Sequence, residues 1–239
     1  TMPAMTRQAV NLAIETSSRQ GAIGVGRGDE LLETRTLGKQ RRHEVGLLPG
    51  IDALFRDRKL NRTELGEVYV SAGPGSFTGL RVAIAAAKML ALAGGAKVVA
   101  LPTLDVIAQN VPAPDQGGPE QVAACLNLKR GTVHSGIYTW RDGGWRLQSQ
   151  AKLRTLAELL AEAGRPVWLV GERLPELPDP LPEGAEVAGP GFALPRAEAV
   201  WRLGRERAKA GAFDDPGTLT PMYIREPEAV TLWREREEK

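Results

Sequence analysis

The chain has 239 residues and a net charge of only +2, with 42% apolar and 25% charged residues. These values are typical of one large globular domain or two small lobes, and they give no argument for a strongly basic nucleic-acid carrier. The single cysteine, Cys125, excludes an internal disulfide, and its apolar neighbours favour a buried side chain over a catalytic thiol. No apolar run reaches the ~18 residues that span a bilayer, and the N-terminus lacks a signal-peptide pattern, so we expect a cytoplasmic protein without a membrane association.

The first 110 residues predict a mixed sheet flanked by helices. Apolar runs bounded by turn residues indicate strands at residues 9–14, 21–26, 30–36, 68–72 and 97–101. Helices are expected at residues 44–59, 80–93 and 102–110. The first of these helices is amphipathic and contains Pro49, which either kinks it or lies in its first turn.

A second α/β unit is predicted after a boundary rich in proline and glycine at residues 111–119. Strands are expected at residues 122–128, 133–140, 145–151 and 167–170, and helices at residues 155–163 and 197–210. Five prolines between residues 175 and 191 favour a loop there. Because the strand–hairpin–strand layout occurs twice, we predict an N-terminal lobe (7–110), a C-terminal lobe (120–212) and a tail (213–239).

The most informative motif is the glycine-rich stretch Gly73–Arg81, which follows a strand and opens a helix. Its glycines allow positive φ and close backbone approach, so the turn can either pack tightly against a neighbour or present amides to an anion. The phosphate motifs do not fit, because Leu80 and Arg81 follow the last glycine where a Walker loop has Lys-Ser or Lys-Thr. Pro74 stands where a hydrolase elbow has glycine. A tight packing turn and a ligand loop are both open interpretations.

Motifs along nearly the whole chain resemble the TsaB (YeaZ) family of the actin-like ATPase superfamily. They are Glu15-Thr16-Ser17-Ser18, His43-Glu44 with Leu47-Leu48-Pro49, Gly73–Arg81 with Ala87-Lys88, and Pro221-Met222-Tyr223-Ile224-Arg225. The resemblance implies a two-lobed actin-like ATPase (ribonuclease H-like) α/β fold with mixed sheets flanked by helices. One departure is Asn127-Leu128-Lys129, where the family pattern leads us to expect an Asp-Ala-Arg-like triplet.

The function implied by this resemblance is a part in making threonylcarbamoyladenosine beside the anticodon of tRNA. In that pathway a sister subunit, TsaD, carries the metal and the active site, and a small ATPase, TsaE, joins the pair. This chain is then a non-catalytic scaffold or activator that binds no cofactor by itself, and it can form a homodimer when the partner is missing. Two alternatives are a stand-alone actin-like ATPase or small-molecule kinase, and a peptidase.

The sequence lacks part of the set of catalytic residues that an ATPase, a kinase or a peptidase would need. Glu15 occupies the place where actin-like ATPases use an Asp for metal and water, and Leu47 stands where a second metal-binding histidine would follow His43. Ser76 has no evident base. A vestigial nucleotide cleft is the remaining ligand hypothesis, with turn-forming hydroxyls and packing glycines as its structural alternative. Its predicted residues are Glu15, Ser17, Ser18, Gly73, Gly75, Ser76 and Gly79.

The resemblance places the subunit interface on the helices at 44–59 and 80–93. We expect the interface to contain His43, Leu47, Leu48, Ile51, Phe55, Arg81, Ala83, Ala86, Ala87 and Leu90. The alternative is that the apolar side chains of both helices are buried in the core of their own lobe. If the interface interpretation holds, Leu47 and Ala83 are exposed members of it, and a charge at either should break pairing without unfolding the lobe.

Basic residues near the first helix are candidates for direct tRNA contact. They are Arg35, Lys39, Arg41, Arg42, Arg56, Arg58 and Lys59. Nearby acidic residues offset them, so a solvated surface is the alternative. The charged segment after Trp233 can be a helix that packs on the complex or a frayed end.

Overall fold

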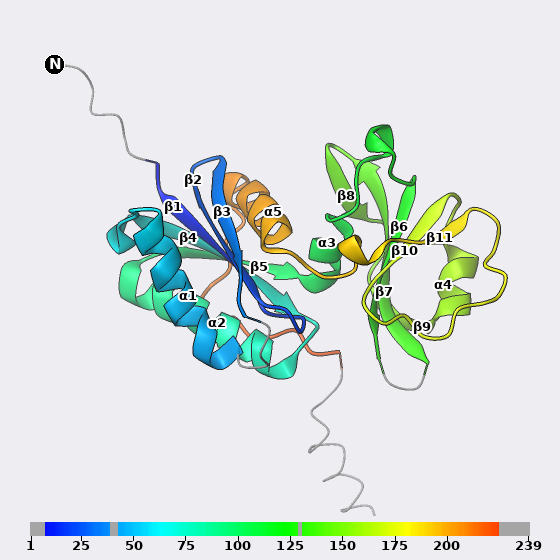
Figure 1. The fold of residues 1–239 in the computed structure, drawn as a ribbon, viewed down its shortest axis with the longest axis horizontal. Helices are drawn as coiled ribbons and strands as arrows, with labels where there is room; N and C mark the ends of the chain where they lie inside the picture. Colours follow the sequence, from blue (N-terminus) through cyan, green and yellow to red (C-terminus); the bar gives the residue numbers. More distant parts are fainter. Residues whose placement is uncertain (1–7, 39–42, 129–130, 225–239) are drawn as a thin grey trace, which may run out of the picture.

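The computed structural model describes residues 8–38, 43–128 and 131–224, except for the side chains of residues 43–45. Within these residues the chain forms two α/β lobes, which are joined through helix α3 (Thr103–Ala108) and a returning segment that ends at helix α5 (Ala197–Lys209) (Figure 1). The tyrosine hydroxyl of Tyr138 in the C-terminal lobe donates to Asp105 of α3 over 2.8 Å. Asp105 also accepts from Arg207 of α5 over 3.2 Å, so this carboxylate ties the two lobes together.

The N-terminal lobe is built on a five-stranded sheet in the order β3-β2-β1-β4-β5. The strands are β1 (Val10–Glu15), β2 (Ala22–Arg27), β3 (Glu30–Thr36), β4 (Leu65–Gly73) and β5 (Lys97–Pro102). The first three strands pair antiparallel, whereas β4 and β5 add in parallel. All six residues of β1 are buried, as its largely apolar sequence predicts for a central strand covered on both faces.

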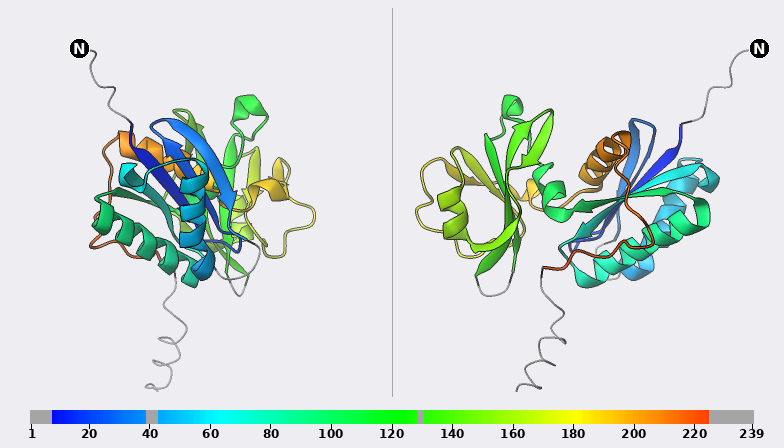
Figure 2. Two further views of the ribbon diagram at one scale, coloured as in Figure 1. Left: turned by 60° about the vertical axis from the view of Figure 1, so that its left-hand side comes forward. Right: turned by 180° about the vertical axis from the view of Figure 1, so that it is seen from behind.

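Helices cover both faces of this sheet (Figure 2). Helices α1 (His43–Asp57) and α2 (Phe77–Gly94) lie on one face, and Pro49 lies inside α1. Small residues of α2 such as Ala83 and Ala87 are fully buried, which allows the helix to approach the sheet closely. Of the described helices, α2 has the length and composition to cross a membrane, as core helices also can, but Arg81 and Lys88 interrupt its apolar residues and it packs on the sheet.

Helix α5 covers the opposite face of the same sheet, which corrects the domain boundary predicted from the sequence. The sequence predicts a C-terminal lobe at residues 120–212, yet Val200 and Trp201 of α5 pack with Ala13 and Tyr69 of the N-terminal sheet. Gly204 lies so close to the Tyr69 ring that a Cβ there would overlap it. The N-terminal lobe is therefore completed by a helix that follows the entire C-terminal sheet in the sequence.

The C-terminal lobe repeats the strand order of the first. Its sheet runs β11-β10-β6-β7-β8, and β9 pairs with the other end of β7. The strands are β6 (Gln121–Asn127), β7 (Thr132–Arg141), β8 (Gly144–Leu147), β9 (Lys152–Thr155), β10 (Val167–Val170) and β11 (Ala185–Val187). Helix α4 (Leu156–Glu162) covers one face and α3 the other. As in the first lobe, three antiparallel strands precede two parallel ones, so the predicted repetition of layout is confirmed.

Two local predictions in this lobe need correction. The strand expected at residues 145–151 is divided between β8 and β9, which pair with opposite ends of β7. The proline-rich stretch at residues 175–191 contains β11, which pairs in parallel with β10. Short 3₁₀ helices at Arg62–Glu64, Pro114–Gln116 and Pro190–Phe192 complete the regular structure of the described residues.

After α5 the chain returns along the edge of the N-terminal sheet as an extended strap, residues 213–224. Asp214 forms an isolated antiparallel bridge with Val98, and its carboxylate accepts from the amide of Ala100 over 2.7 Å. Further along, the amide of Met222 donates to the carbonyl of Ala72 over 2.7 Å. The strap therefore ends beside the glycine-rich turn and the first turn of α2 (Figure 2).

Candidate functional site

The glycine-rich turn packs against the turn that follows β1. A Cβ at Gly79 would overlap the carbonyl oxygen of Thr16, and a Cβ at Gly75 would overlap that of Ser17. The two turns are also joined by hydrogen bonds, from the Ser76 amide to the Ser17 carbonyl over 2.7 Å and from the Thr16 hydroxyl to the Gly79 carbonyl over 2.7 Å. These contacts support the packing-turn interpretation, because the glycines provide the space that the neighbouring backbone occupies.

Ser76 begins helix α2 rather than serving as a nucleophile. Its hydroxyl oxygen accepts from the Gly79 amide over 3.3 Å as the N-cap of the helix. Cys125, the other residue that could attack a substrate, is fully buried, and burial raises the pKa of its thiol to about 12. Neither side chain is placed for covalent catalysis, since the first caps a helix and the second is held as a neutral thiol.

Glu15 is fully buried, and its carboxylate is satisfied by its own neighbours. The amide and the hydroxyl of Ser17 each donate to Oε1 over 2.6 Å, and the hydroxyl of Ser71 donates to Oε2. Burial raises the pKa of Glu15 above its ordinary value, although these hydrogen bonds oppose the shift. Glu15 thus secures the turn after β1, and it is not among the residues that line the cleft between the lobes. The buried carboxylate of Glu15, which is bonded to Ser17 and Ser71, does not fit the metal and phosphate site of an actin-like ATPase.

A pH dependence of stability follows from the position of Glu15. Because the folded chain holds this proton to higher pH than the unfolded chain does, the free energy of unfolding should fall as pH rises above the ordinary value of 4.5. Replacing Glu15 with glutamine keeps the side chain neutral, so the variant should gain stability relative to the wild type as pH rises. Urea unfolding at several values between about pH 4 and about pH 8 measures the difference.

A suitable control for this experiment is Glu158, whose pKa is lowered by the hydrogen bonds it accepts from Thr155 as part of a capping box. Glu158→Gln should change stability in the opposite direction, losing it as pH rises. Parallel pH profiles for the wild type and Glu15→Gln would contradict the buried carboxyl described above.

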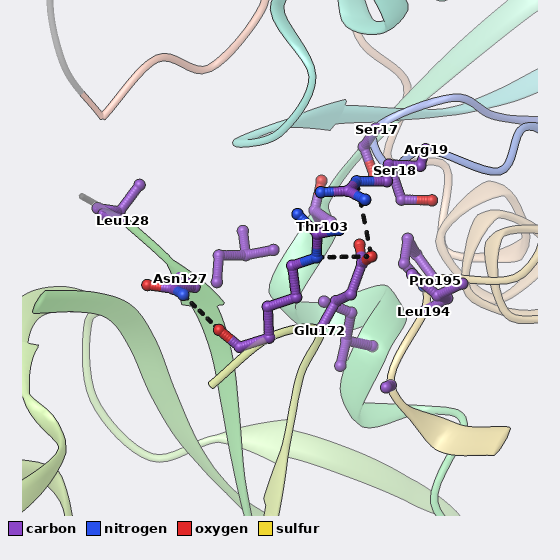
Figure 3. Close-up of a pocket in the computed structure, with 13 residues that line it drawn as sticks. Ser17, Ser18, Arg19, Thr103, Asn127, Leu128, Glu172, Leu194 and Pro195 are labelled. Atoms are coloured by element: carbon purple, nitrogen blue, oxygen red, sulfur yellow. Dashed lines mark hydrogen bonds and ion pairs between the residues drawn. The ribbon is translucent and has the colours of Figure 1, made fainter. Parts of the chain in front are cut away.

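The cleft between the lobes has a volume of about 360 Å³ (Figure 3). Arg19, after β1, lies 3.7 Å from Glu172, after β10, so an ion pair spans the cleft. Asn127, from the triplet that departs from the family pattern, donates its amide to the carbonyl of Arg173. The hydroxyl of Thr103 is buried at the cleft without a hydrogen-bond partner among the described residues. The cleft therefore combines apolar side chains with two arginines that share one carboxylate.

The structure brings only part of the predicted nucleotide site to this cleft. Ser17 and Ser18 line it. The other predicted residues, which are Glu15, Gly73, Gly75, Ser76 and Gly79, are not among its lining residues. Sequence reasoning missed Thr103, Glu172 and Arg173, because no local pattern shows which residues of the second lobe face the first.

A second candidate site is an apolar face on the outer side of α1 and α2. Nine large hydrophobic side chains are exposed among the described residues, and six of them lie on α1, α2 and the strap. These six, which define the apolar face, are Leu48, Phe77, Met89, Leu92, Met222 and Tyr223. Between the helices runs a groove of about 440 Å³, lined mainly by apolar side chains that include Leu48, Phe55 and Leu90. Such a concentration is typical of a protein-binding surface.

The predicted interface residues divide between this face and the core. Leu48 and Arg81 are exposed, and Ile51, Phe55 and Leu90 line the groove. Leu47, Ala83, Ala86 and Ala87 are buried against the sheet, so the expectation that Leu47 and Ala83 are exposed is wrong. The side chain of His43 lies outside the described part of the structure. Sequence reasoning missed Met89, Leu92 and the strap residues, although i, i+4 spacing along α2 could have identified the first two.

The basic residues near α1 are largely paired with acids. Arg35 lies 2.6 Å from Glu33 and 3.0 Å from Asp57, and Arg56 lies 3.3 Å from Asp52. Lys39, Arg41 and Arg42 lie outside the described residues, as does the tail after Ile224. The described part of this surface is a network of ion pairs and gives no support for a site that neutralises phosphates.

Comparisons with known proteins agree with this architecture. The family model of TsaD, tRNA N6-adenosine threonylcarbamoyltransferase, matches residues 35–145. A Bacillus subtilis protein named tRNA threonylcarbamoyladenosine biosynthesis protein TsaB is 26% identical over 231 residues, 94% of this chain and 97% of that protein. An uncharacterized Mycobacterium bovis protein is 36% identical over 228 residues, 92% of this chain and 94% of its own length. A Pseudomonas aeruginosa crystal structure, described as similar to peptidase YeaZ, has a TM-score of 0.74 at 25% identity, covering 91% of this chain and 100% of that one.

Two lobes with the same mixed-sheet order, flanked by helices and separated by a cleft, define a protein of the actin-like ATPase fold. Within that class the glycine-rich turn serves packing, and the exposed apolar residues gather on the outer helices of the first lobe. The chain belongs to the TsaB (YeaZ) family.

Proposed function

We propose that this chain is a non-catalytic subunit of the tRNA threonylcarbamoyl transferase complex, needed to form threonylcarbamoyladenosine beside the anticodon. In this proposal the apolar face binds a TsaD-type catalytic subunit. A TsaE-type ATPase joins the pair, and tRNA is held by the complex as a whole. The chain then works in the cytoplasm, where tRNA is modified.

The observation that carries the proposal is the apolar face. Leu48 on α1 and Met89 and Leu92 on α2 are exposed beside an apolar groove. Exposure of these apolar side chains to water is unfavourable, and a partner that covers them would remove that cost. The names of the relatives and the TsaD family model, which matches the segment that contains both helices, support a TsaD-type subunit as the occupant. A second copy of this chain is the competing occupant when that subunit is absent.

The residues predicted for the nucleotide site support a division of labour within the complex. Glu15 uses both carboxylate oxygens inside the lobe, and the amides of Ser76 and Gly79 are engaged in the turn itself. Glu15 is fully buried, and none of these three residues lines the cleft, so these groups are not presented to a metal ion or a phosphate there. We therefore propose that ATP and metal are handled by the partner subunits and that this chain supplies binding and activation.

The test is a reconstitution of the modification from purified components. The TsaD-type subunit, the TsaE-type ATPase, tRNA, ATP and threonylcarbamoyl-adenylate are combined with and without this chain, and modified adenosine is measured. Modification should depend on the chain, while the chain alone should hydrolyse no ATP. Modification without it would contradict the proposal, and ATP turnover by the chain alone would favour a stand-alone ATPase or kinase.

A further inference from the structure

The end of the strap forms a compact cluster with the first turns of α2. The rings of Phe77 and Tyr223 lie 5.3 Å apart between centroids, and the guanidinium carbon of Arg81 lies 3.8 Å from the centre of the Phe77 ring. Arg81 Nε also donates to the Tyr223 hydroxyl over 3.1 Å. Both aromatic side chains are about two-fifths exposed, at 42% for Phe77 and 41% for Tyr223. The cluster orients the arginine and leaves it at the surface.

The strap holds this cluster in place through contacts of the residues that precede Tyr223. The Met222 amide pairs with the Ala72 carbonyl, and the ammonium of Lys88 on α2 donates to the Gly217 carbonyl over 3.3 Å. Tyr223 is therefore fixed against α2 by backbone contacts of the strap, and Arg81 gains an orienting partner from a segment that is distant in sequence.

The cluster is continuous with the apolar face. Residues Phe77, Arg81, Ala85, Met89 and Leu92 recur at intervals of three or four, so they form one exposed stripe along α2. The strap borders this stripe on one side, and the groove with α1 borders it on the other. A partner that covers the apolar face along the length of α2 will also meet the cluster at its end.

The charges on this stripe indicate what the partner must supply. Helix α2 contains Arg81 and Lys88 and no acidic residue. Neither cation forms an ion pair with a described residue, since Arg81 bonds to a hydroxyl and Lys88 to a carbonyl. Two copies of α2 packed together would bring like charges close in an apolar setting, which is unfavourable.

We infer that Arg81, oriented by Phe77 and Tyr223, is a specificity-determining residue of the apolar face that binds a carboxylate of the TsaD-type subunit and disfavours a second copy of this chain. This inference rests on the proposed function.

The test measures binding of the full chain to its TsaD-type subunit by calorimetry, at about 50 and about 300 mM salt. Arg81→Glu should weaken binding at least about 30-fold, and Arg81→Gln should weaken it less while reducing its salt dependence. Tyr223→Ala should weaken binding as well, because the arginine loses its orienting partner. The matched control is Arg141→Glu, the same charge change at an exposed site in the C-terminal lobe, which should bind like the wild type.

The tendency of the chain to form a homodimer is a second measurement, which would not change if Arg81 only stabilised the fold. Sedimentation should show that Arg81→Gln forms homodimer more readily than the wild type, because one like-charge contact has been removed. Melting temperatures near that of the wild type confirm that the variants are folded. If Leu48→Glu abolishes binding to the TsaD-type subunit and Arg81→Glu does not, the inference is wrong and the proposed function stands. If the wild type does not bind that subunit at all, both are wrong.

Discussion

Replacing Gly79 with alanine should lower the free energy of unfolding by about 3 kcal/mol and the melting temperature by about 6–12 °C. The added Cβ would lie closer than 3.0 Å to the carbonyl oxygen of Thr16, which is backbone and cannot move without shifting the turn after β1. Helix propensity favours alanine by about 1 kcal/mol, but the overlap outweighs this gain. Thermal and urea unfolding of the purified variant measure the effect.

Gly46 offers a matched control for this prediction, because it lies inside α1 and no described residue comes within 4 Å of the position a Cβ would take. Gly46→Ala should stabilise the chain by up to about 1 kcal/mol, since alanine is the better helix former. If Gly79→Ala were equally harmless, the glycine would not be needed for packing, and the glycine-rich turn would again be a candidate ligand loop.

The second large effect is expected from a charge substitution in α1, and it should differ between two adjacent leucines. Leu48 is 48% exposed beside the groove, whereas Leu47 is 1% exposed against the sheet. Leu48→Glu should therefore leave the melting temperature nearly unchanged and weaken binding to the TsaD-type subunit at least about 30-fold. Leu47→Glu should instead unfold the N-terminal lobe, because it buries a charge without a partner at a cost of several kcal/mol.

Circular dichroism melting and a binding titration on both variants distinguish these outcomes. Ala83→Glu, at a fully buried position of α2, should behave like Leu47→Glu. A folded Leu48→Glu variant that binds as tightly as the wild type would remove α1 from the proposed interface. A folded Leu47→Glu variant would contradict the packing of α1 described here.

The fold could be predicted further than the site, for reasons visible at particular residues. Apolar runs and turn residues predict the strands of the first sheet to within a few positions, since a strand that is covered on both faces, such as β1, must be largely apolar. The helix at residues 197–210 is equally clear from its periodicity. The position of this helix in the fold could not be predicted in the same way. Periodicity shows that Val200 and Trp201 are buried, but it does not show that they pack on Tyr69, more than a hundred residues earlier.

The site depends still more on contacts between distant segments. Whether Gly79 serves packing or a ligand is decided by Thr16, and whether Arg81 is free or oriented is decided by Tyr223. The same limit explains the error at Leu47. The apolar stripe of α1 is broad enough to face the sheet and a groove at once, and the sequence does not show which of its members faces which.

The return of α5 to the first sheet also sets an order of events during synthesis of the chain. The face of that sheet under α1 and α2 can be covered once residue 94 has left the ribosome, but the opposite face must wait for α5, which ends at residue 209. At about 5–20 residues per second, the roughly one hundred residues between β5 and the end of α5 take about 5–20 s to appear. For that interval Ala13, Tyr69 and Val99 lack the helix that covers them in the finished lobe. The outer helices that carry the proposed subunit-binding face are thus made early, while the nascent lobe remains open on its other side until the C-terminal sheet has been made.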